Sequence, residues 1–138
     1  MTPSNLHKAI NNKTALIGII GMGYVGLPLA LAFADNGYQI TGFDIDSGKI
    51  EALLKGESYI SYIPDDSISK YLNSGNFKPS NEFSKLADMN IILICVPTPL
   101  DEKKEPDLQF VKMTAQTICS NLQAGQLVIL ESTTYPGC

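Results

Sequence analysis

The chain has 138 residues, of which 44% are hydrophobic and 17% charged, the length and composition of one globular domain. Its net charge of −4 argues against a nucleic acid or an anionic membrane as partner, because both are bound through basic patches. No apolar run approaches the roughly 20 residues of a membrane span, and the polar N-terminus shows no hydrophobic signal segment. We therefore expect a cytoplasmic protein with a polar N-terminal arm over residues 1–13 and one domain over residues 14–138.

The first part of that domain alternates strands with helices. Residues 15–20 predict a buried strand, and a helix follows from about Tyr24 to residues 35–37. The apolar residues that recur on one face of this helix are Val25, Leu29, Ala32 and Phe33. A second strand is expected at residues 38–45. Asp46 or Ser47 then caps a short helix that ends at Gly56.

The alternation continues to the end of the chain. We expect a short helix at residues 66–75, a weak edge strand at 76–80, one or two helical turns at 81–89 and a buried strand at 90–97. A long helix starts near Pro106, and the last strand covers residues 126–132. The apolar stripe of that helix consists of Leu108, Val111, Ala115, Ile118 and Leu122. This pattern predicts an α/β fold with a doubly wound parallel sheet, the Rossmann fold, in strand order 3-2-1-4-5.

The cysteines and the single histidine do not indicate a reactive centre. Cys95 lies in a predicted buried strand and Cys119 on the apolar side of a helix, so both are expected to be inert core residues. His7 is expected to be exposed to solvent. No spacing is typical of a metal site or of a nucleophile–histidine pair, so the sequence predicts no catalytic residue and no metal ligand.

A glycine-rich turn separates the first strand from the first helix. Gly21, Gly23 and Gly26 match the pattern G-x-G-x-x-G, which in this context is typical of dinucleotide binding. Gly21 allows the tight turn, Gly23 leaves room for a pyrophosphate, and Gly26 lets the helix pack closely. The amide groups around Tyr24 and Val25 are expected to face the anion.

An acidic residue follows at the end of the second strand. Asp44 lies 18 positions after Gly26, where a carboxylate accepts hydrogen bonds from ribose hydroxyls and repels the 2′-phosphate of NADP. No arginine follows in DIDSGKI, so NAD is favoured over NADP. The alternative role of Asp44 and Asp46 is capping of the next helix, which we assign mainly to Asp46. The segments PTP, from Pro97, and STT, from Ser132, are expected at the same edge of the sheet.

Four segments resemble the N-terminal NAD-binding domain of the UDP-glucose/GDP-mannose dehydrogenase family: GMGYVGLPLALAFA, GFDIDSGKIEALLKGES, ICVPTPLDEKKEPDL and LESTTYPG. The last two, with YIPDD, look most like the UDP-N-acetylglucosamine 6-dehydrogenases. The resemblance implies an enzyme that oxidises the C6 alcohol of a UDP-sugar to a carboxylate with two NAD. The residues implied to bind the cofactor are Gly21, Gly23, Tyr24, Val25, Gly26, Asp44, Lys49, Pro97, Thr98 and Thr133.

Within that set the resemblance assigns separate parts of the cofactor. Asp44 and Lys49 are implied to hold the adenosine ribose, whereas Thr98 and Thr133 lie towards the nicotinamide. By spacing alone, Lys49 is equally well a surface lysine in the first turn of a helix. The family's catalytic cysteine, most of its sugar pocket and its usual dimer interface belong to regions after residue 138. Cys138 occupies a position where relatives usually carry threonine, and we do not assign it as a nucleophile.

The resemblance therefore implies a part of a larger homo-oligomeric enzyme, ending before the family's sixth strand. This part is expected to bind NAD without oxidising the sugar. The last strand is left at the edge of the sheet, and exposed edges recruit further strands, so self-association through that edge or marginal stability is expected. Two alternatives stay open at this point: an S-adenosylmethionine-dependent methyltransferase-like domain, and a non-catalytic module that senses NAD.

Overall fold

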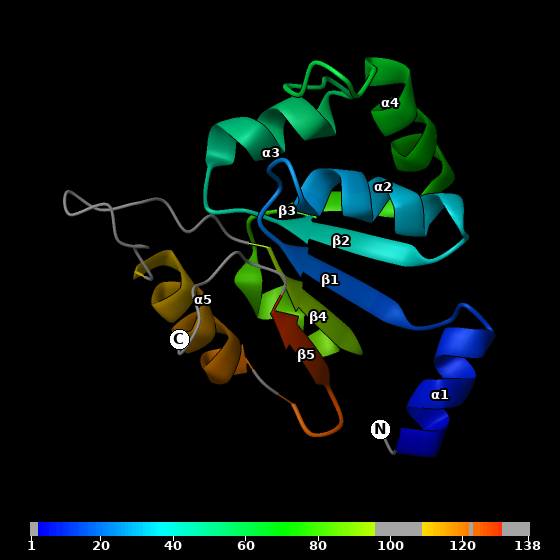
Figure 1. Cartoon of the computed structure of the whole chain (residues 1–138), viewed down its shortest axis with the longest axis vertical. Coiled ribbons are helices and arrows are strands. Elements are labelled where there is room, and N and C mark those ends of the chain that lie inside the picture. Colours follow the sequence, from blue (N-terminus) through cyan, green and yellow to red (C-terminus); the bar gives the residue numbers. More distant parts are fainter. Residues whose placement is uncertain (1–2, 96–108, 122, 131–138) are drawn as a thin grey trace.

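A five-stranded parallel sheet forms the centre of the structure (Figure 1). The computed structural model describes residues 3–95, 109–121 and 123–130. The strands are β1 (Leu16–Ile20), β2 (Gln39–Phe43), β3 (Phe77–Ser80), β4 (Ile91–Ile94) and β5 (Leu127–Leu130). They are ordered β3-β2-β1-β4-β5 and every neighbouring pair is parallel. The predicted fold class and strand order are confirmed.

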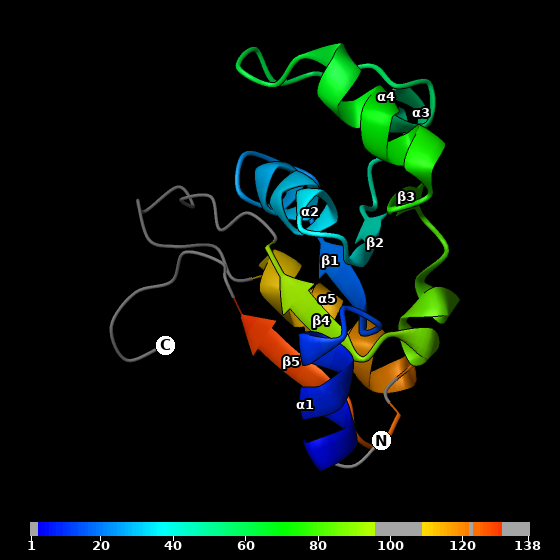
Figure 2. The ribbon, with the colours of Figure 1, turned by 90° about the vertical axis from the view of Figure 1, so that its right-hand side faces the viewer.

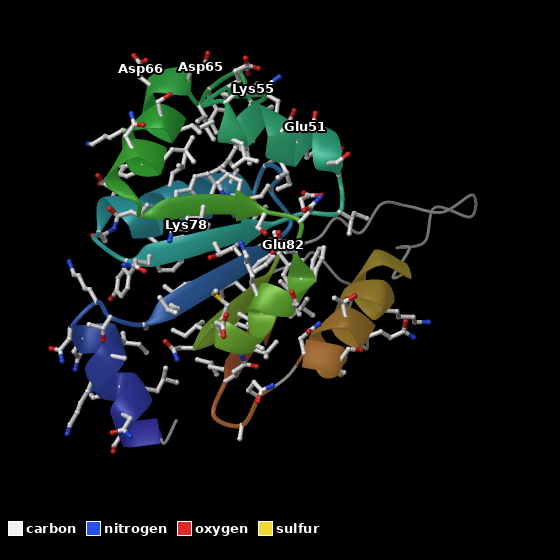
Figure 3. All side chains as sticks on the ribbon, turned by 180° about the vertical axis from the view of Figure 1, so that it is seen from behind. Glu51, Lys55, Asp65, Asp66, Lys78 and Glu82 are labelled. Atoms are coloured by element: carbon white, nitrogen blue, oxygen red, sulfur yellow. The ribbon has the colours of Figure 1, made fainter. Side chains whose placement is uncertain are left out.

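Helices cover both faces of the sheet. They are α1 (Pro3–Asn11), α2 (Gly26–Asp35), α3 (Ser47–Leu54), α4 (Asp65–Ser74), the 3-10 helix η1 (Phe83–Asp88) and α5 (Gln109–Asn121). Figure 1 shows α2 in front of the sheet, and Figure 3, from behind, shows η1 on the opposite face. Helix α4 packs against α2 and β3, and α5 packs against η1. Figure 2 shows α4 above α2, with α3 largely hidden behind α4.

Alternating side chains along the strands build two cores. In β1, Ile17 and Ile19 join the core beneath α2, whereas Ile20 joins the core beneath η1. Burial on both faces explains why the strands are continuous apolar runs. In the register, Ile17 lies beside Ile40 on one side and Ile91 on the other. This parallel register brings the carboxyl ends of β1, β2, β4 and β5 to one edge of the sheet.

The residues predicted to be a polar arm form helix α1. Its buried side comprises Leu6, Ala9 and Ile10, which pack on the core beneath α2. The Tyr38 hydroxyl donates a hydrogen bond to the carbonyl oxygen of Ile10 at 2.9 Å. The spacing of 3 and 4 between these apolar residues is that of an amphipathic helix, a signal masked by the polar residues around them.

The predicted buried face of α2 is wrong. The buried residues are Gly26, Leu27, Ala30, Leu31 and Ala34, whereas Val25 is 55% exposed, Ala32 is exposed, and Leu29 and Phe33 are partly buried. Almost every position of α2 is apolar, so periodicity could not select a face. The helix begins at Gly26, which is buried close to the carbonyl oxygen of Gly21.

Of the predicted stripe on α5, the structure describes the side chain of Ala115 alone, and its predicted burial is wrong. Ala115 and Cys119 are exposed, whereas Thr117 and Asn121 are partly buried. The other stripe positions lie outside the described side chains. Cys95, by contrast, is buried at the end of β4, as predicted. The prediction that Cys119 is a core residue is wrong, because its side of α5 is exposed.

The helix caps follow the sequence. The Asp46 carboxylate accepts hydrogen bonds from the amides of Gly48 and Lys49, as predicted, and so caps α3. Gly75, with φ of 83°, ends α4 in the left-handed region. Within the part of the chain that the structure describes, no helix is long and apolar enough to cross a membrane.

Candidate functional site

The glycine turn connects β1 to α2 at the carboxyl edge of the sheet. Gly21 has φ of 100°, a conformation that favours glycine, and its amide donates to the carbonyl oxygen of Phe43 at 2.7 Å. A Cβ on Gly26 would lie 1.7 Å from the carbonyl oxygen of Gly21. Gly21 and Gly26 are therefore required by the fold itself.

Gly23 has a different surrounding. A Cβ built on Gly23 meets nothing within 4 Å, and its φ is not in the left-handed region. The space beside Gly23 is thus open, and the backbone there can be approached closely from outside. The fold does not require a glycine at this position, whereas a ligand lying against the backbone would.

Three consecutive amides of this segment lack an acceptor within the described part of the chain. Those of Gly23, Tyr24 and Val25 donate no hydrogen bond to any residue that the structure describes. They stand at the N-terminus of α2, where the helix dipole favours a negative charge. The side chains of Tyr24 and Val25 are 73% and 55% exposed, so they do not close the site. The predicted residues are thus assembled into an arrangement able to bind an anion.

Asp44 lies across from the turn, at the end of β2. Its Oδ2 accepts a hydrogen bond from the amide of Met22 at 2.8 Å, and its Oδ1 accepts one from the amide of Asp46 at 2.9 Å. The side chain is buried, yet each carboxylate oxygen can accept a further hydrogen bond. Asp44 therefore ties β2 to the glycine turn and does not cap α3, which is the task of Asp46.

Lys49 lies in the first turn of α3, which begins three residues after Asp44. Its Nζ is 5.8 Å from the ring centroid of Tyr59, a cation–π distance. Tyr59 in turn donates a hydrogen bond to the carbonyl oxygen of Met22, inside the glycine turn. Burial, together with the carboxylates of Asp44 and Asp46, raises the pKa of Tyr59 well above its ordinary value. The phenol is therefore a stable donor.

Sequence reasoning missed two tyrosines of this site. Besides Tyr59, Tyr62 donates a hydrogen bond from its hydroxyl to the carbonyl oxygen of Tyr24 at 3.3 Å, and the rings of Tyr24 and Tyr62 are 6.5 Å apart. Both missed residues belong to the connection between α3 and α4, which the sequence predicts as an irregular linker. Two tyrosines three positions apart in a linker carry no signal that would assign them to a turn nearly 40 residues away.

The remaining predicted residues, Pro97, Thr98 and Thr133, lie outside the described residues. The strands that precede them, β4 and β5, end at the same edge as Gly21 and Asp44. Among the described residues, no group of three or more histidine, cysteine, aspartate or glutamate side chains could hold a metal ion.

A glycine turn that opens a helix, with a carboxylate at the end of the next strand and strand order 3-2-1-4-5, defines a dinucleotide-binding domain. The sequence profile of the "UDP-glucose/GDP-mannose dehydrogenase family, NAD binding domain" matches residues 15–138. The chain belongs to this family, and its cofactor is NAD. This finding agrees with the resemblance and removes the methyltransferase-like alternative.

Known relatives are similar over most of this chain. It is 39% identical over 123 residues to the UDP-N-acetyl-D-mannosamine dehydrogenase of Escherichia coli K12, covering 89% of this chain and 29% of the relative. It is 37% identical over 124 residues to the UDP-N-acetyl-D-glucosamine 6-dehydrogenase of Salmonella typhi, covering 88% and 28%. The solved structure of the UDP-D-ManNAc dehydrogenase of Pyrococcus horikoshii superposes with a TM-score of 0.82 at 36% identity, covering 88% of this chain and 29% of that one. The chain thus spans less than a third of the length of these relatives.

Proposed function

We propose that this chain is the NAD-binding part of an enzyme that oxidises the C6 alcohol of a UDP-sugar, UDP-N-acetylglucosamine, to a carboxylate. The observation that supports this most directly is the open backbone at Gly23, where three consecutive amides have no acceptor among the described residues, next to Met22, whose amide donates to Asp44. When bound, NAD supplies the hydride acceptor, and oxidation of an alcohol to a carboxylate consumes two. The chain by itself binds the cofactor and does not oxidise the sugar.

The described residues fit NAD at the diphosphate and the adenosine ribose. The amides of Tyr24 and Val25, together with that of Gly23 before them, would hold the diphosphate, because no side chain on Gly23 separates them from it. The remaining acceptor sites on the Asp44 carboxylate would accept the ribose hydroxyls, with Lys49 beside them. Pro97, Thr98 and Thr133 stay predicted contacts of the nicotinamide half.

Asp44 also favours NAD over NADP. Its carboxylate would repel a 2′-phosphate, and the segment DIDSGKI contains no arginine to bind one. We expect clearly weaker binding of NADP for this reason.

The sugar is the finer part of the proposal. Relatives named for UDP-N-acetyl-D-glucosamine and for UDP-N-acetyl-D-mannosamine are both 36–39% identical to this chain, so identity does not separate the two. The motifs noted in the sequence favour the glucosamine form. Assembly into a homo-oligomer and a cytoplasmic location also remain predictions.

Titration calorimetry of the chain with NAD and with NADP tests the proposal. We expect heat of binding with NAD and a weaker response with NADP. An absence of heat with NAD at millimolar concentration would refute the cofactor site. For the enzyme of which this chain is part, release of two NADH per UDP-N-acetylglucosamine, and not from the mannosamine isomer, would support the substrate. The reverse preference would reject it.

A further inference from the structure

The three peptide groups that carry the amides of Gly23, Tyr24 and Val25 are each held by a hydrogen bond to their carbonyl oxygen. The carbonyl of Met22 accepts from the hydroxyl of Tyr59, and that of Gly23 accepts from the amide of Leu27 at 3.1 Å. The carbonyl of Tyr24 accepts from the hydroxyl of Tyr62 at 3.3 Å. Two of these three donors therefore come from outside the turn and from outside α2.

Pro28 explains why the carbonyl of Tyr24 needs an outside donor. The amide of Leu27 bonds to Gly23, and the amide of Leu29 bonds to Val25 at 3.2 Å, the normal ladder of a helix. The next hydrogen bond after that of Leu27 would run from the amide of residue 28 to the carbonyl oxygen of Tyr24, but residue 28 is proline and has no N–H. The phenol of Tyr62 supplies the hydrogen bond that Pro28 cannot.

Holding the carbonyls also orients the amides. In a trans peptide group the N–H points opposite to the C=O, and the group is planar. A carbonyl of Met22 fixed towards Tyr59 therefore directs the Gly23 amide the other way. The carbonyl of Tyr24 is fixed towards Tyr62, so the amide of Val25 in the same peptide group points away from Tyr62.

The segment that carries both tyrosines is itself well anchored. Ile60 and Ile63 are 3% and 8% exposed and belong to the core beneath α2. The amide of Ser58 donates to the carboxylate of Asp65 at 2.8 Å, at the start of α4, where Asp65 is labelled in Figure 3. The phenols are thus held by a fixed platform.

We propose that Tyr59 and Tyr62 are positioning residues for the coenzyme, which hold the carbonyls of Met22 and Tyr24 so that the amides of Gly23 and Val25 face the diphosphate. This role rests on the proposed function and adds to it a part of the chain with no place in the glycine motif. It makes the connection between α3 and α4 a determinant of NAD affinity.

The test compares NAD affinity in three phenylalanine variants of the chain by titration calorimetry. Tyr59→Phe and Tyr62→Phe each remove one hydroxyl that holds the turn, and each should weaken NAD binding roughly three- to tenfold. Tyr71→Phe is the matched control, because its hydroxyl donates to Asp35 at 2.6 Å, away from the turn. It should change the affinity less than about twofold. Amide NMR signals of Gly23 and Val25, recorded with saturating NAD, should shift less in the first two variants than in the wild-type chain.

A rescue variant separates positioning from a general loss of structure. Pro28→Ala returns an N–H to residue 28, so the carbonyl of Tyr24 regains a donor from the helix itself. The double variant Pro28→Ala/Tyr62→Phe should recover the NAD affinity that Tyr62→Phe loses, and Pro28→Ala should not rescue Tyr59→Phe. If Pro28→Ala restores NAD affinity to Tyr62→Phe and not to Tyr59→Phe, the positioning role is supported even where a single variant lowers the melting temperature.

The outcomes distinguish the two proposals. A wild-type chain that binds no NAD would reject the proposed function and the positioning role with it. A wild-type chain that binds NAD, with Tyr59→Phe and Tyr62→Phe equal to it, would overturn the positioning role alone. Weakened binding that Pro28→Ala fails to rescue in the Tyr62→Phe variant would also overturn it.

Discussion

Replacement by alanine should have different effects at two glycines of the same turn: Gly26→Ala should lower stability, and Gly23→Ala should lower NAD affinity. In Gly26→Ala the new Cβ starts 1.7 Å from the carbonyl oxygen of Gly21, a backbone atom that cannot rotate away. The two atoms must separate to at least 3.0 Å, so α2 has to move away from the end of β1. In Gly23→Ala the Cβ meets nothing within 4 Å.

These distances predict a large loss of unfolding free energy in Gly26→Ala and almost none in Gly23→Ala. Overpacking costs about 1–3 kcal/mol even where side chains can adjust, so a backbone clash in Gly26→Ala should cost at least about 3 kcal/mol of unfolding free energy. That corresponds to a fall in melting temperature of about 10 °C or more. Gly23→Ala should stay within about 0.5 kcal/mol of the wild-type stability, yet weaken NAD at least tenfold, about 1.4 kcal/mol.

Thermal unfolding without ligand, followed by calorimetric titration with NAD, separates the two effects. The reasoning requires Gly23→Ala to be stable and defective in binding, and Gly26→Ala to be unstable before any ligand is added. If Gly23→Ala bound NAD as tightly as the wild-type chain, the diphosphate would not lie against this backbone. If Gly26→Ala melted normally, the close approach of α2 to Gly21 would be wrong.

Three further predictions follow from the same site and from the edge of the sheet. Asp44→Ala should weaken NAD by about 1.5–3 kcal/mol and lower the melting temperature, because the amide of Met22 loses its acceptor; unchanged affinity in calorimetry would show that the ribose is held elsewhere. Because burial and then the nearby carboxylates raise the pKa of Tyr59, the unfolded chain releases that proton at lower pH than the folded chain. The contribution of Tyr59 to the free energy of unfolding should therefore be complete below about pH 10 and be lost as the pH rises beyond it. In urea unfolding at several pH values, the free energy of unfolding of Tyr59→Phe should decrease less with pH than that of the wild-type chain; an equal decrease would contradict the assignment. The chain should self-associate through β5, where Val128 is 39% exposed, and light scattering should show less association for Val128→Lys; a wild-type monomer at high concentration would count against this edge.

Local spacing was sufficient for the parts of this protein that neighbouring residues decide. The apolar run before Gly21 predicted a strand, and the residues after Gly26 predicted a helix. The turn between them was predictable because its first position has a backbone conformation that favours glycine. The cap at Asp46 needed only the two amides that follow it within three residues. The alternation of strands and helices predicted a parallel sheet with right-handed crossovers, and the order 3-2-1-4-5 is the one typical of doubly wound dinucleotide-binding sheets.

Tertiary structure decided what depends on a direction in space. The buried side of α2 was ambiguous in a helix that is apolar almost all round, and the structure shows that it is the side of Gly26, close to the carbonyl oxygen of Gly21. The exposure of Cys119 depends on which side of α5 meets η1. The contacts of Tyr59 and Tyr62 with the glycine turn span 37 and 38 residues. Sequence spacing constrains only atoms that a few bonds connect, so contacts across such separations arise only when buried side chains such as Ile60 fix the path of the chain between them.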